Sequence, residues 1–447
     1  MDVGPCGPGL DRLWPLWVRR GPLSAYSSQP GADLLSKADR AERLKAARRA
    51  QAVKPSDRGP VLARTRNLKM ARSAHAYVRG STIKFYEWLE TRPSALPSGP
   101  PVWICGDCHL GNLGPLANAK GRVDIQIRDL DQTVVGNPAH DLIRLGLSLA
   151  SAARGSDLPG VVTAQMLEAM IEGYEEALAA DFDQDAPHPP MIGAVLREAE
   201  RRTWKHLAND RLAGVRPEIS IGKRFWPITR TERHEIEEIC AGAPVRDLVT
   251  SLKSRGRKDE IRMLDAAYWV KGCSSLGRLR FAVLLEVDGG DGPPDICFLD
   301  IKEAIKAAAP REEGAAMPRG NAERVVAGAM ALSPNLGQRM AAGRLLDKAV
   351  FVRELMPQDM KLEIVGLAPA EAMDAARSLA RVVGDAHGRQ MDAAMRKAWI
   401  ADLARNRSGT LDAPSWLWSS VVDLMAVHEA AYLEHCRRYA LGLRREG

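Results

Sequence analysis

The sequence lacks any long uninterrupted apolar stretch, and this absence argues against a protein that spans a membrane by helices. Charged residues interrupt every apolar run before it reaches the roughly 18 residues of a membrane-spanning helix, so we expect no integral membrane association. Cysteine is also scarce, with seven residues in a chain of 447. So low and odd a count does not fit a disulfide scaffold, and it predicts a reducing, cytoplasmic environment.

The chain also lacks a clear secretory signal and a strong excess of charge in its main part. Asp2, Asp11 and Pro15 interrupt the apolar patch at the start, where a signal peptide would be continuously apolar. Residues 1–60 carry +5 of the net charge of +7, so the remainder is nearly neutral and we expect no nucleic-acid partner. We interpret residues 1–60 as a basic flexible tail, with 34–50 as a possible solvated helix. A targeting or docking segment is the alternative.

The rest of the sequence has the composition of a globular protein, with 45% hydrophobic and 27% charged residues. Its periodicity predicts a mostly helical α+β fold. Helices are expected over 64–90, 139–180 and 377–389, with mainly helical structure over 186–260. Strands are expected at 102–105, 123–128, 267–272, 279–287, 296–302 and 350–355. We divide the chain into the tail (1–60), a helical lobe with catalytic and metal-binding loops (61–260), a small β-rich nucleotide-binding lobe (261–365), and C-terminal helices that pack on the helical lobe (366–447).

The densest chemical signal lies in the segment Cys105-Gly-Asp-Cys-His-Leu-Gly-Asn112 and in Ile127-Arg-Asp-Leu-Asp131 after it. Asp107 supplies a candidate base, while Asn112, Asp129 and Asp131 supply oxygen ligands. Hard oxygen ligands suit Mg²⁺, which completes its coordination with water and phosphate oxygens. Together these groups predict a site for phosphoryl transfer, since that reaction needs a positioned nucleophile and a metal that neutralises charge. The alternative is a surface turn stabilised by Asx caps.

His109, Arg79 and a cysteine pair lie in or near this pattern, and each has more than one interpretation. His109 is a candidate catalytic partner of Asp107, with a structural role as the alternative. Arg79 is expected to hold a phosphate or to brace Asp107, and the alternative is a surface salt bridge. Cys105 and Cys108 have the CxxC spacing, but no second cysteine or histidine pair stands at zinc spacing. We therefore predict neither a zinc site nor a redox site there.

A second group of residues predicts a nucleotide-binding turn. The segment Gly272-Cys-Ser-Ser-Leu-Gly277, which includes Ser274 and Ser275, separates two predicted strands. Lys302 ends the next apolar strand, where a charged side chain needs a partner. We expect it to pair with Glu323 and with nucleotide phosphates, and an edge-strand lysine that prevents aggregation is the alternative. Glu323 would lie one turn into a helix whose N-cap is Asn321.

The run GDCHLGN…IRDLDQTVVGNPAHDLIRL resembles the catalytic segment of the aminoglycoside phosphotransferase and choline kinase branch of the protein-kinase-like superfamily. The resemblance implies that Asp107 is the catalytic base, Asn112 a metal ligand and Asp129 the principal Mg²⁺ ligand. It also implies that Asp141 is a buried aspartate that braces the loop. Two positions depart from the family pattern, because Cys105 replaces a histidine and Asn137 replaces an aspartate.

The chain from about 60 to 440 resembles a narrower bacterial family, the domain of unknown function DUF2252. The features that carry this resemblance are an arginine-rich approach, an aromatic–Arg–Gly element, the Gly-Asp-x-His segment and a Lys-Glu-Ala element. In this sequence they are Arg64, Arg66 and Met70, Tyr77-Val-Arg79-Gly80, Gly106–His109, and Lys302-Glu303-Ala304. This family name implies no established activity.

The order of the motifs differs from that of ordinary kinases, in which the Gly-rich turn and its lysine precede the catalytic loop. Here 272–277 and Lys302 follow it, and the helix at 377–389 resembles the one that precedes the loop in small-molecule kinases. We therefore expect a two-lobed, circularly permuted kinase-like fold. In such a fold Lys302 would face Asp129 across a cleft, with side-chain tips within about 10 Å so that one triphosphate contacts both. The expected function is an ATP- and Mg²⁺-dependent phosphotransferase with an unknown hydroxyl acceptor. The alternatives are a non-catalytic nucleotide-binding scaffold and, less well supported, a metal-dependent phosphohydrolase.

Overall fold

The structure is a computed structural model, and it has an α+β fold in which about half of the residues are helical. It describes residues 52–92, 96–179, 190–203, 218–251, 255–273, 275–290, 294–360, 368–404 and 414–440. These residues belong to one compact unit, Lys45–Gly447. The helix proposed over 34–50 lies outside the described residues.

The helical pattern expected over 64–90 is divided into three helices. They are α2 (Arg58–Met70), α3 (Ala74–Gly80) and α4 (Thr82–Glu90), and the short 3₁₀ helix η1 (Pro55–Asp57) precedes them. The chain turns at Ser73, whose side chain accepts a hydrogen bond from the backbone N–H of Ala76 at the start of α3. An N-cap of this kind starts a new helix and so interrupts the previous one.

Four short strands follow, and they form two small antiparallel pairs. β1 (Val102–Ile104) pairs with β4 (Val134–Gly136), and β2 (Leu113–Ala117) pairs with β3 (Val123–Ile127). The 3₁₀ helix η2 (Leu110–Asn112) lies between β1 and β2. All residues of β2 and β4 are buried, so these strands have no alternation of apolar and polar residues by which the sequence could reveal them.

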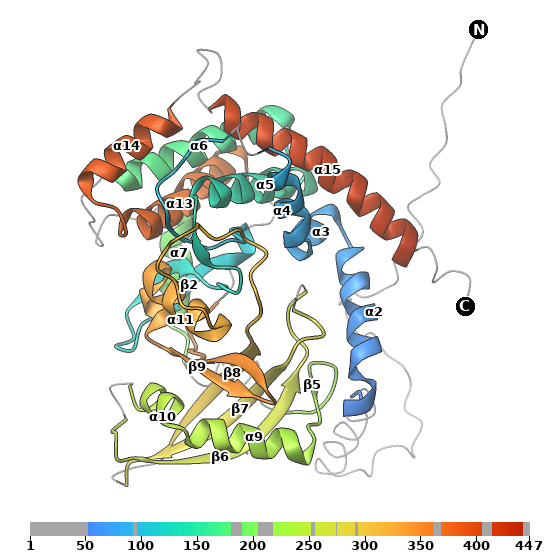
Figure 1. Ribbon diagram of the computed structural model, residues 1–447, viewed down its shortest axis with the longest axis vertical. Helices are drawn as coiled ribbons and strands as arrows, with labels where there is room; N and C mark the ends of the chain where they lie inside the picture. The colour runs from blue at the N-terminus through green and yellow to red at the C-terminus, as the bar shows by residue number, and fades with distance from the viewer. Residues whose placement is uncertain are drawn as a thin grey trace, which may run out of the picture. The chain divides into compact units, whose positions relative to one another are not determined.

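The main helical core follows the strand pairs and is completed by the C-terminal third of the chain (Figure 1). Its helices are α5 (Ala139–Gly155), α6 (Gly160–Ala179), α7 (Pro190–Glu200), α13 (Pro369–Gly388), α14 (Ala393–Leu403) and α15 (Ser415–Tyr439). The helix expected over 139–180 is interrupted between α5 and α6, where Pro159 stands between two glycines. No helix in the described part of the chain combines the length and the apolar character needed to cross a membrane.

A six-stranded antiparallel sheet forms the second part of this unit. Its strand order is β5-β6-β7-β8-β10-β9. The strands are β5 (Phe225–Trp226), β6 (Glu260–Trp269), β7 (Arg280–Asp288), β8 (Asp295–Glu303), β9 (Met340–Leu345) and β10 (Lys348–Glu354). Helices α9 (Arg230–Ala241) and α10 (Ala243–Val249) contribute to the core on one face of the sheet, so the sheet-associated part begins upstream of residue 261. The connection between β8 and β9 contains α11 (Asn321–Leu332) and α12 (Pro334–Gly337).

The two faces of the sheet are buried in different cores. On β7, Phe281 and Val283 pack with α9 and α10, whereas Ala282 and Leu284 belong to a separate cluster on the other face. Because side chains alternate along a strand, Asp300 and Lys302 on β8 lie on the same face as Phe298 of that second cluster. The alternation predicted for this region is therefore present, and it decides which face carries the polar residues of the site.

Helix α11 begins one residue away from the predicted position. The N-cap is Gly320 rather than Asn321, and no side chain caps it. The prediction relied on the general preference for asparagine at N-caps, but here Asn321 has already joined the first turn of the helix.

The close packing of α6 against α13 depends on glycines at the crossing. A Cβ atom at Gly173 would collide with the backbone carbonyl oxygen of Arg377 on α13. Gly384 of α13 is similarly close to α6, since a Cβ there would lie 2.8 Å from the carbonyl oxygen of Tyr174. Backbone atoms cannot move aside as the end of a flexible side chain can, so the two helices approach closely only with glycine at these positions.

We expect Gly173→Ala to lower the free energy of unfolding by roughly 1–3 kcal/mol, because overpacking forces the helices apart. This change is opposite in sign to the usual effect, since alanine in an open helical position stabilises by up to about 1 kcal/mol over glycine. Gly59→Ala is the control, because Gly59 is helical and nothing lies within 4 Å of its Cβ position. Urea unfolding of both variants provides the measurement, and equal stabilities would contradict the proposed crossing.

Candidate functional site

The buried carboxylate of Asp141 holds the start of the segment 105–112, which lies between β1 and β2. Asp141, in the first turn of α5, accepts hydrogen bonds from the backbone N–H groups of Cys105 and Gly106 at 2.6 and 2.9 Å. The ring of His387 on α13 lies 3.2 Å from the same carboxylate, and its other nitrogen contacts the hydroxyl of Tyr174 at 2.9 Å. Asp141 and His387 are completely buried. The bracing contact expected of Asp141 is therefore present.

Gly106 fixes the direction in which this segment leaves β1. Its φ of +73° lies in the left-handed region, which side chains disfavour. A Cβ atom at this position would also collide with the backbone carbonyl of Gln132. The segment 105–112 and the loop 128–133 after β3 are consequently in direct backbone contact, and this brings their polar side chains together.

Asp107, the predicted base, is held by two neighbours. Its Oδ1 accepts from Nε of Arg144 at 2.8 Å, and its Oδ2 accepts from the hydroxyl of Thr82 at 2.9 Å. Arg144 is fully buried on α5 and also donates to the carbonyl of Val78 at 2.6 Å. The Asp107 side chain retains 13% of its exposure. Both of its oxygens thus have a partner within the protein, although a carboxylate has further lone pairs with which to accept.

Neither Arg144 nor Thr82 was predicted as part of the site. The sequence contains one signal for Arg144, which stands among Leu142, Ile143 and Leu145 in an otherwise apolar run and therefore needs a buried anionic partner. Thr82 has no comparable signal, because its contact depends on how α4 packs beside the segment 105–112.

Arg79, the residue expected to brace Asp107 or to hold a phosphate, lies over the segment 105–112. A Cβ atom at Gly111 would be 2.6 Å from Nη2 of Arg79, so the guanidinium rests directly against the backbone there. The bracing role belongs to Arg144 instead. The Nε atom of Arg79 is buried and has no hydrogen-bond partner in the described part of the chain. Arg79 therefore retains a donor for a further acceptor.

His109 serves a structural purpose in this geometry. Its Nδ1 accepts a hydrogen bond from the backbone N–H of Gly111 at 3.1 Å, and the residue is 5% exposed. Burial lowers the pKa of His109 to about 3, with Arg79 and Arg144 acting in the same direction. The imidazole is thus neutral near pH 7, so the catalytic role predicted for His109 is not that of a proton donor at that pH.

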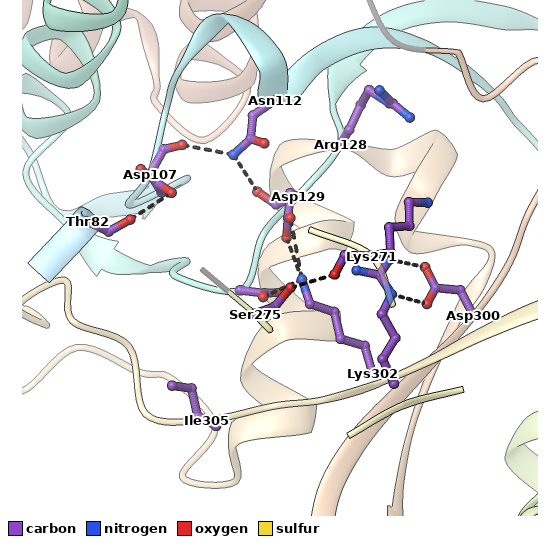
Figure 2. Close-up of polar contacts among 12 residues, drawn as sticks. Thr82, Asp107, Asn112, Arg128, Asp129, Lys271, Ser275, Asp300, Lys302 and Ile305 are labelled. Carbon is purple, nitrogen blue, oxygen red and sulfur yellow. Dashed lines mark hydrogen bonds and ion pairs between the residues drawn. The ribbon is translucent and has the colours of Figure 1, made fainter. Parts of the chain in front are cut away.

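Asn112 connects the segment 105–112 to the loop that carries Asp129. Its side-chain nitrogen donates to the backbone carbonyl of Asp107 at 2.9 Å and to that of Asp129 at 3.4 Å. Figure 2 shows the resulting series of polar contacts from Asp107 through Asn112 and Asp129 to Lys302. The amide nitrogen is committed to these carbonyls, and the Oδ1 atom forms no hydrogen bond with the described residues.

Lys302 lies next to Asp129, as predicted. The lysine Nζ is 3.2 Å from one carboxylate oxygen of Asp129 and 3.4 Å from the other, although the two residues are 173 apart in the chain. Lys302 also forms a close ion pair with Asp131. It is 4% exposed, so the ammonium group needs this neutralisation.

The predicted pairing of Lys302 with Glu323 is wrong. Glu323 is exposed on the first turn of α11, whereas Asp129 and Asp131 satisfy the lysine from the other side of the site. Two carboxylates already balance the single ammonium charge. The pairing was inferred from the kinase template, and no local pattern around Glu323 specified its distance to Lys302.

The two aspartates differ in their environments. The side chain of Asp129 is 48% exposed, whereas that of Asp131 is 16% exposed. Burial and the neighbouring Asp129 raise the pKa of Asp131 to about 6. Partial burial acts in the same direction at Asp129, but Lys302 holds the pKa of Asp129 well below its usual value. Asp129 is therefore the anionic member that solvent reaches.

The oxygen atoms of Asp129, Asp131 and Asn112 are of a chemical type that suits Mg²⁺. Asp131 has one buried carboxylate oxygen, Oδ1, with no hydrogen-bond partner in the described part of the chain. With Asp129 and Oδ1 of Asn112 it forms a set of oxygen ligands of the kind that Mg²⁺ prefers. No cluster of three or more His, Cys, Asp and Glu side chains suitable for a metal occurs among the described residues. The protein would thus supply few ligands, as is usual where phosphate oxygens complete the shell.

The predicted nucleotide-binding turn joins β6 to β7 at the Lys302 end of the sheet. Gly272 and Gly277 have φ values of +92° and +100°, which favour glycine. The hydroxyl of Ser275 donates to the carbonyl of Lys271 at 3.4 Å, whereas Ser274 lies outside the described residues. Arg280, three residues after the turn, pairs in register with Lys302, so the turn begins beside the lysine.

A buried network that the sequence did not reveal supports this end of the sheet. Asp300 accepts two hydrogen bonds from Arg280, at 2.9 and 2.5 Å, and further ones from Arg353 on β10. Burial acts to raise the pKa of Asp300, but the two arginines hold it well below its usual value. Arg353 also donates to the carbonyl of Arg128 at 3.2 Å. The network therefore connects three strands to the residue that directly precedes Asp129.

The fold and this site define an α+β protein in which polar residues from three distant segments converge. A family model described as "Uncharacterized protein conserved in bacteria (DUF2252)" matches residues 58–438. Because the match covers most of the chain, the protein belongs to this family. No curated protein and no solved structure matches it.

Burial of His109 predicts a specific loss of stability in mild acid. The histidine pKa is 6.5 in the unfolded chain and about 3 in the folded one, so the unfolded state binds the proton more tightly. The contribution of His109 is complete above pH 6.5 and is lost as the pH falls toward 3. At pH 5.5 the loss amounts to roughly 1 kcal/mol. His109→Asn retains an acceptor for Gly111 and cannot be protonated, so its stability should fall less between pH 7.5 and 5.5. Urea unfolding at both pH values measures this, and equal losses in the two proteins would show that His109 titrates normally.

Proposed function

We propose that the protein is an ATP- and Mg²⁺-dependent phosphotransferase that acts on a hydroxyl-bearing acceptor. The observation that carries the proposal is the contact of Lys302 with Asp129 and Asp131. Kinases bind a metal–nucleotide complex between a lysine on a strand of one lobe and an aspartate in the other lobe. Lys302 on β8 and Asp129 in the loop after β3 resemble this arrangement.

Most of the candidate residues have a role in this proposal that their contacts support. Lys302 would bind the α- and β-phosphates, and the turn 272–277 would cover them. Asp129, Asp131 and Oδ1 of Asn112 would hold Mg²⁺, which neutralises the charge of the phosphates when it is bound. Arg79 would offer its unpaired Nε to a phosphate oxygen. The proposed kinase-like fold is circularly permuted, because the catalytic segment 105–131 precedes the turn and Lys302 in the chain.

One observation favours a second candidate, a nucleotide-binding protein without phosphotransferase activity. Arg144 and Thr82 both bind the carboxylate of Asp107, so each of its oxygens already has a partner within the protein. A carboxylate held in this way can serve a structural purpose, and the nucleotide site does not require it to act on an acceptor. The two candidates share the nucleotide site and differ only in whether turnover follows.

Binding of Mg²⁺-ATP is expected to raise the melting temperature of the full-length protein, because a ligand that binds the folded state stabilises it. Asp129→Asn should weaken Mg²⁺-ATP binding at least tenfold, since the exposed anionic ligand is lost. Lys302→Met should have a similar effect through the phosphates. Lys348→Met is the matched control, because Lys348 is another sheet lysine with a carboxylate partner, Glu303. Absence of a shift with any nucleotide and Mg²⁺ in the wild-type protein would refute the nucleotide site.

The role of Asp107 separates the two candidates. Asp107→Asn leaves the metal ligands intact, so nucleotide binding, measured as the melting shift relative to the same variant without ligand, should change less than twofold. If the protein is a phosphotransferase, ADP formation in the presence of an acceptor pool should fall at least a hundredfold, within the range typical of a lost acid–base group. If the wild-type protein binds Mg²⁺-ATP but forms no ADP with any acceptor, the non-catalytic candidate is correct. The reference for folding is far-UV circular dichroism, since Arg144 loses its charged partner in this variant.

A further inference from the structure

A cavity of about 890 Å³ is lined by residues other than those of the proposed phosphotransfer site. Its wall is formed by α4, the start of α5, the long segment between β8 and α11, and the first turn of α11. Asp107, Asn112, Asp129 and Lys302 are not among its lining residues. The volume lies within the range of pockets that bind small molecules.

Arg324, in the first turn of α11, is the most informative residue of this cavity. It is 4% exposed, and its Nε atom is buried without a hydrogen-bond partner in the described part of the chain. Its other nitrogens donate to the backbone carbonyls of Thr133, Asp131 and Ile305. Among the described residues no carboxylate forms an ion pair with it. A buried guanidinium that has only carbonyl partners keeps a free donor, and Asp131 opposes its charge only at longer range than an ion pair, which is costly unless an anion binds.

The remaining charged residues that line the cavity are basic, with one exception. Lys306, Arg311 and Arg319 are exposed at its wall and form no ion pair with the described residues, while Glu90 is the acidic lining residue. The N-terminus of α11, which carries a partial positive charge, lies at the same wall and has no side-chain cap. His140 adds a further polar atom to the wall, because its buried Nδ1, which donates or accepts according to the tautomer, has no partner in the described region.

The uncharged part of the wall is largely apolar. Leu89, Leu96, Val134, Met317 and Pro310 line the cavity together with a run of alanines, 307–309. A fully hydrated inorganic ion would gain nothing from such a surface. The combination of basic groups with an apolar surface instead matches an organic molecule that has an anionic head and an apolar body.

We propose that this cavity binds a small amphipathic organic anion, with its phosphate or carboxylate head on Arg324 and its apolar body against Met317 and Leu89. The site is separate from the proposed nucleotide site and does not depend on phosphotransferase activity. It is nevertheless in contact with the same loops, because Arg324 binds the backbone of Asp131 and the cavity residue Ala308 donates to the side chain of Gln132. The bound anion would therefore stabilise the conformation of the loop 128–133.

The test is isothermal titration calorimetry on the full-length protein, without nucleotide or Mg²⁺. The probes are octyl phosphate and sodium octanoate, each below its micellar concentration, with octyl glucoside as the neutral probe of equal chain length. We expect saturable binding of at least one anionic probe, at least tenfold tighter than any binding of octyl glucoside. The stronger of the two anions identifies the head group as a phosphate or as a carboxylate. Failure of both anions to bind, or equal binding of the neutral probe, would overturn the proposal.

Variants locate the binding at this cavity. Met317→Trp fills the apolar part of the cavity and should weaken binding of the anionic probe at least tenfold without removing any charge. The combined variant Lys306→Ser, Arg311→Ser and Arg319→Ser should have a comparable effect by removing charge at the wall.

The control for charge is the combined variant Arg64→Ser, Lys120→Ser and Arg230→Ser, which removes three exposed positive charges elsewhere and should change the affinity less than twofold. Equal weakening in the wall variant and in this control would show that attraction is non-specific, and unchanged affinity in Met317→Trp would show that the probe binds elsewhere. All three variants alter exposed or partly exposed side chains, and circular dichroism verifies that each is folded.

Discussion

The ammonium group of Lys302 has to be neutralised, and this requirement joins the two halves of the structure. The lysine is almost completely buried on β8, and the carboxylates that balance it belong to a loop 173 residues earlier in the chain. Removal of both carboxylates would leave a buried, uncompensated ammonium charge, which costs several kcal/mol. The sheet therefore cannot move away from the helical part without breaking this contact, and Asn112, Asp107 and the turn 272–277 keep their relation to one another through it.

The sequence revealed those parts of the site that are set by local patterns. Asp107, Asn112, Asp129 and Lys302 each follow a predicted strand or lie on a turn, and chemistry that fits a single ligand predicted their proximity. Four of the six strands of the sheet were also predicted, helped by the alternation along β7, whereas β9 was missed and β5 lies in a range that was expected to be mainly helical. The α+β class followed from the same periodicity. Such features depend on spacing along the chain and on residue type, and both are visible in one sequence.

The features that escaped prediction depend on tertiary contacts. Arg144 reaches Asp107 only because α5 packs beneath the segment 105–112, and no spacing rule connects the two residues. Lys302 was assigned to Glu323 by analogy, but the distance between a strand and a later helix is set by the 17 residues between β8 and α11, whose path has no regular pattern. The strands β2 and β4 were missed since they are buried on both sides. In each case the contact depends on which surfaces pack together in the folded chain, and the pattern of one sequence does not show this.

The support of the segment 105–112 has a consequence for the order in which the protein is made. Asp141 is synthesised soon after the residues that it braces, but its partner His387 follows 246 residues later. At the usual rate of roughly 5–20 residues per second, the ribosome adds that length in roughly 10–50 s. Throughout this interval the nascent helical part lacks α13, and with it the ring that contacts the Asp141 carboxylate. The segment that carries Asp107 thus attains its final geometry only after α13 has been synthesised, so a chain truncated before α13 would lack both the complete helical core and a fully braced site.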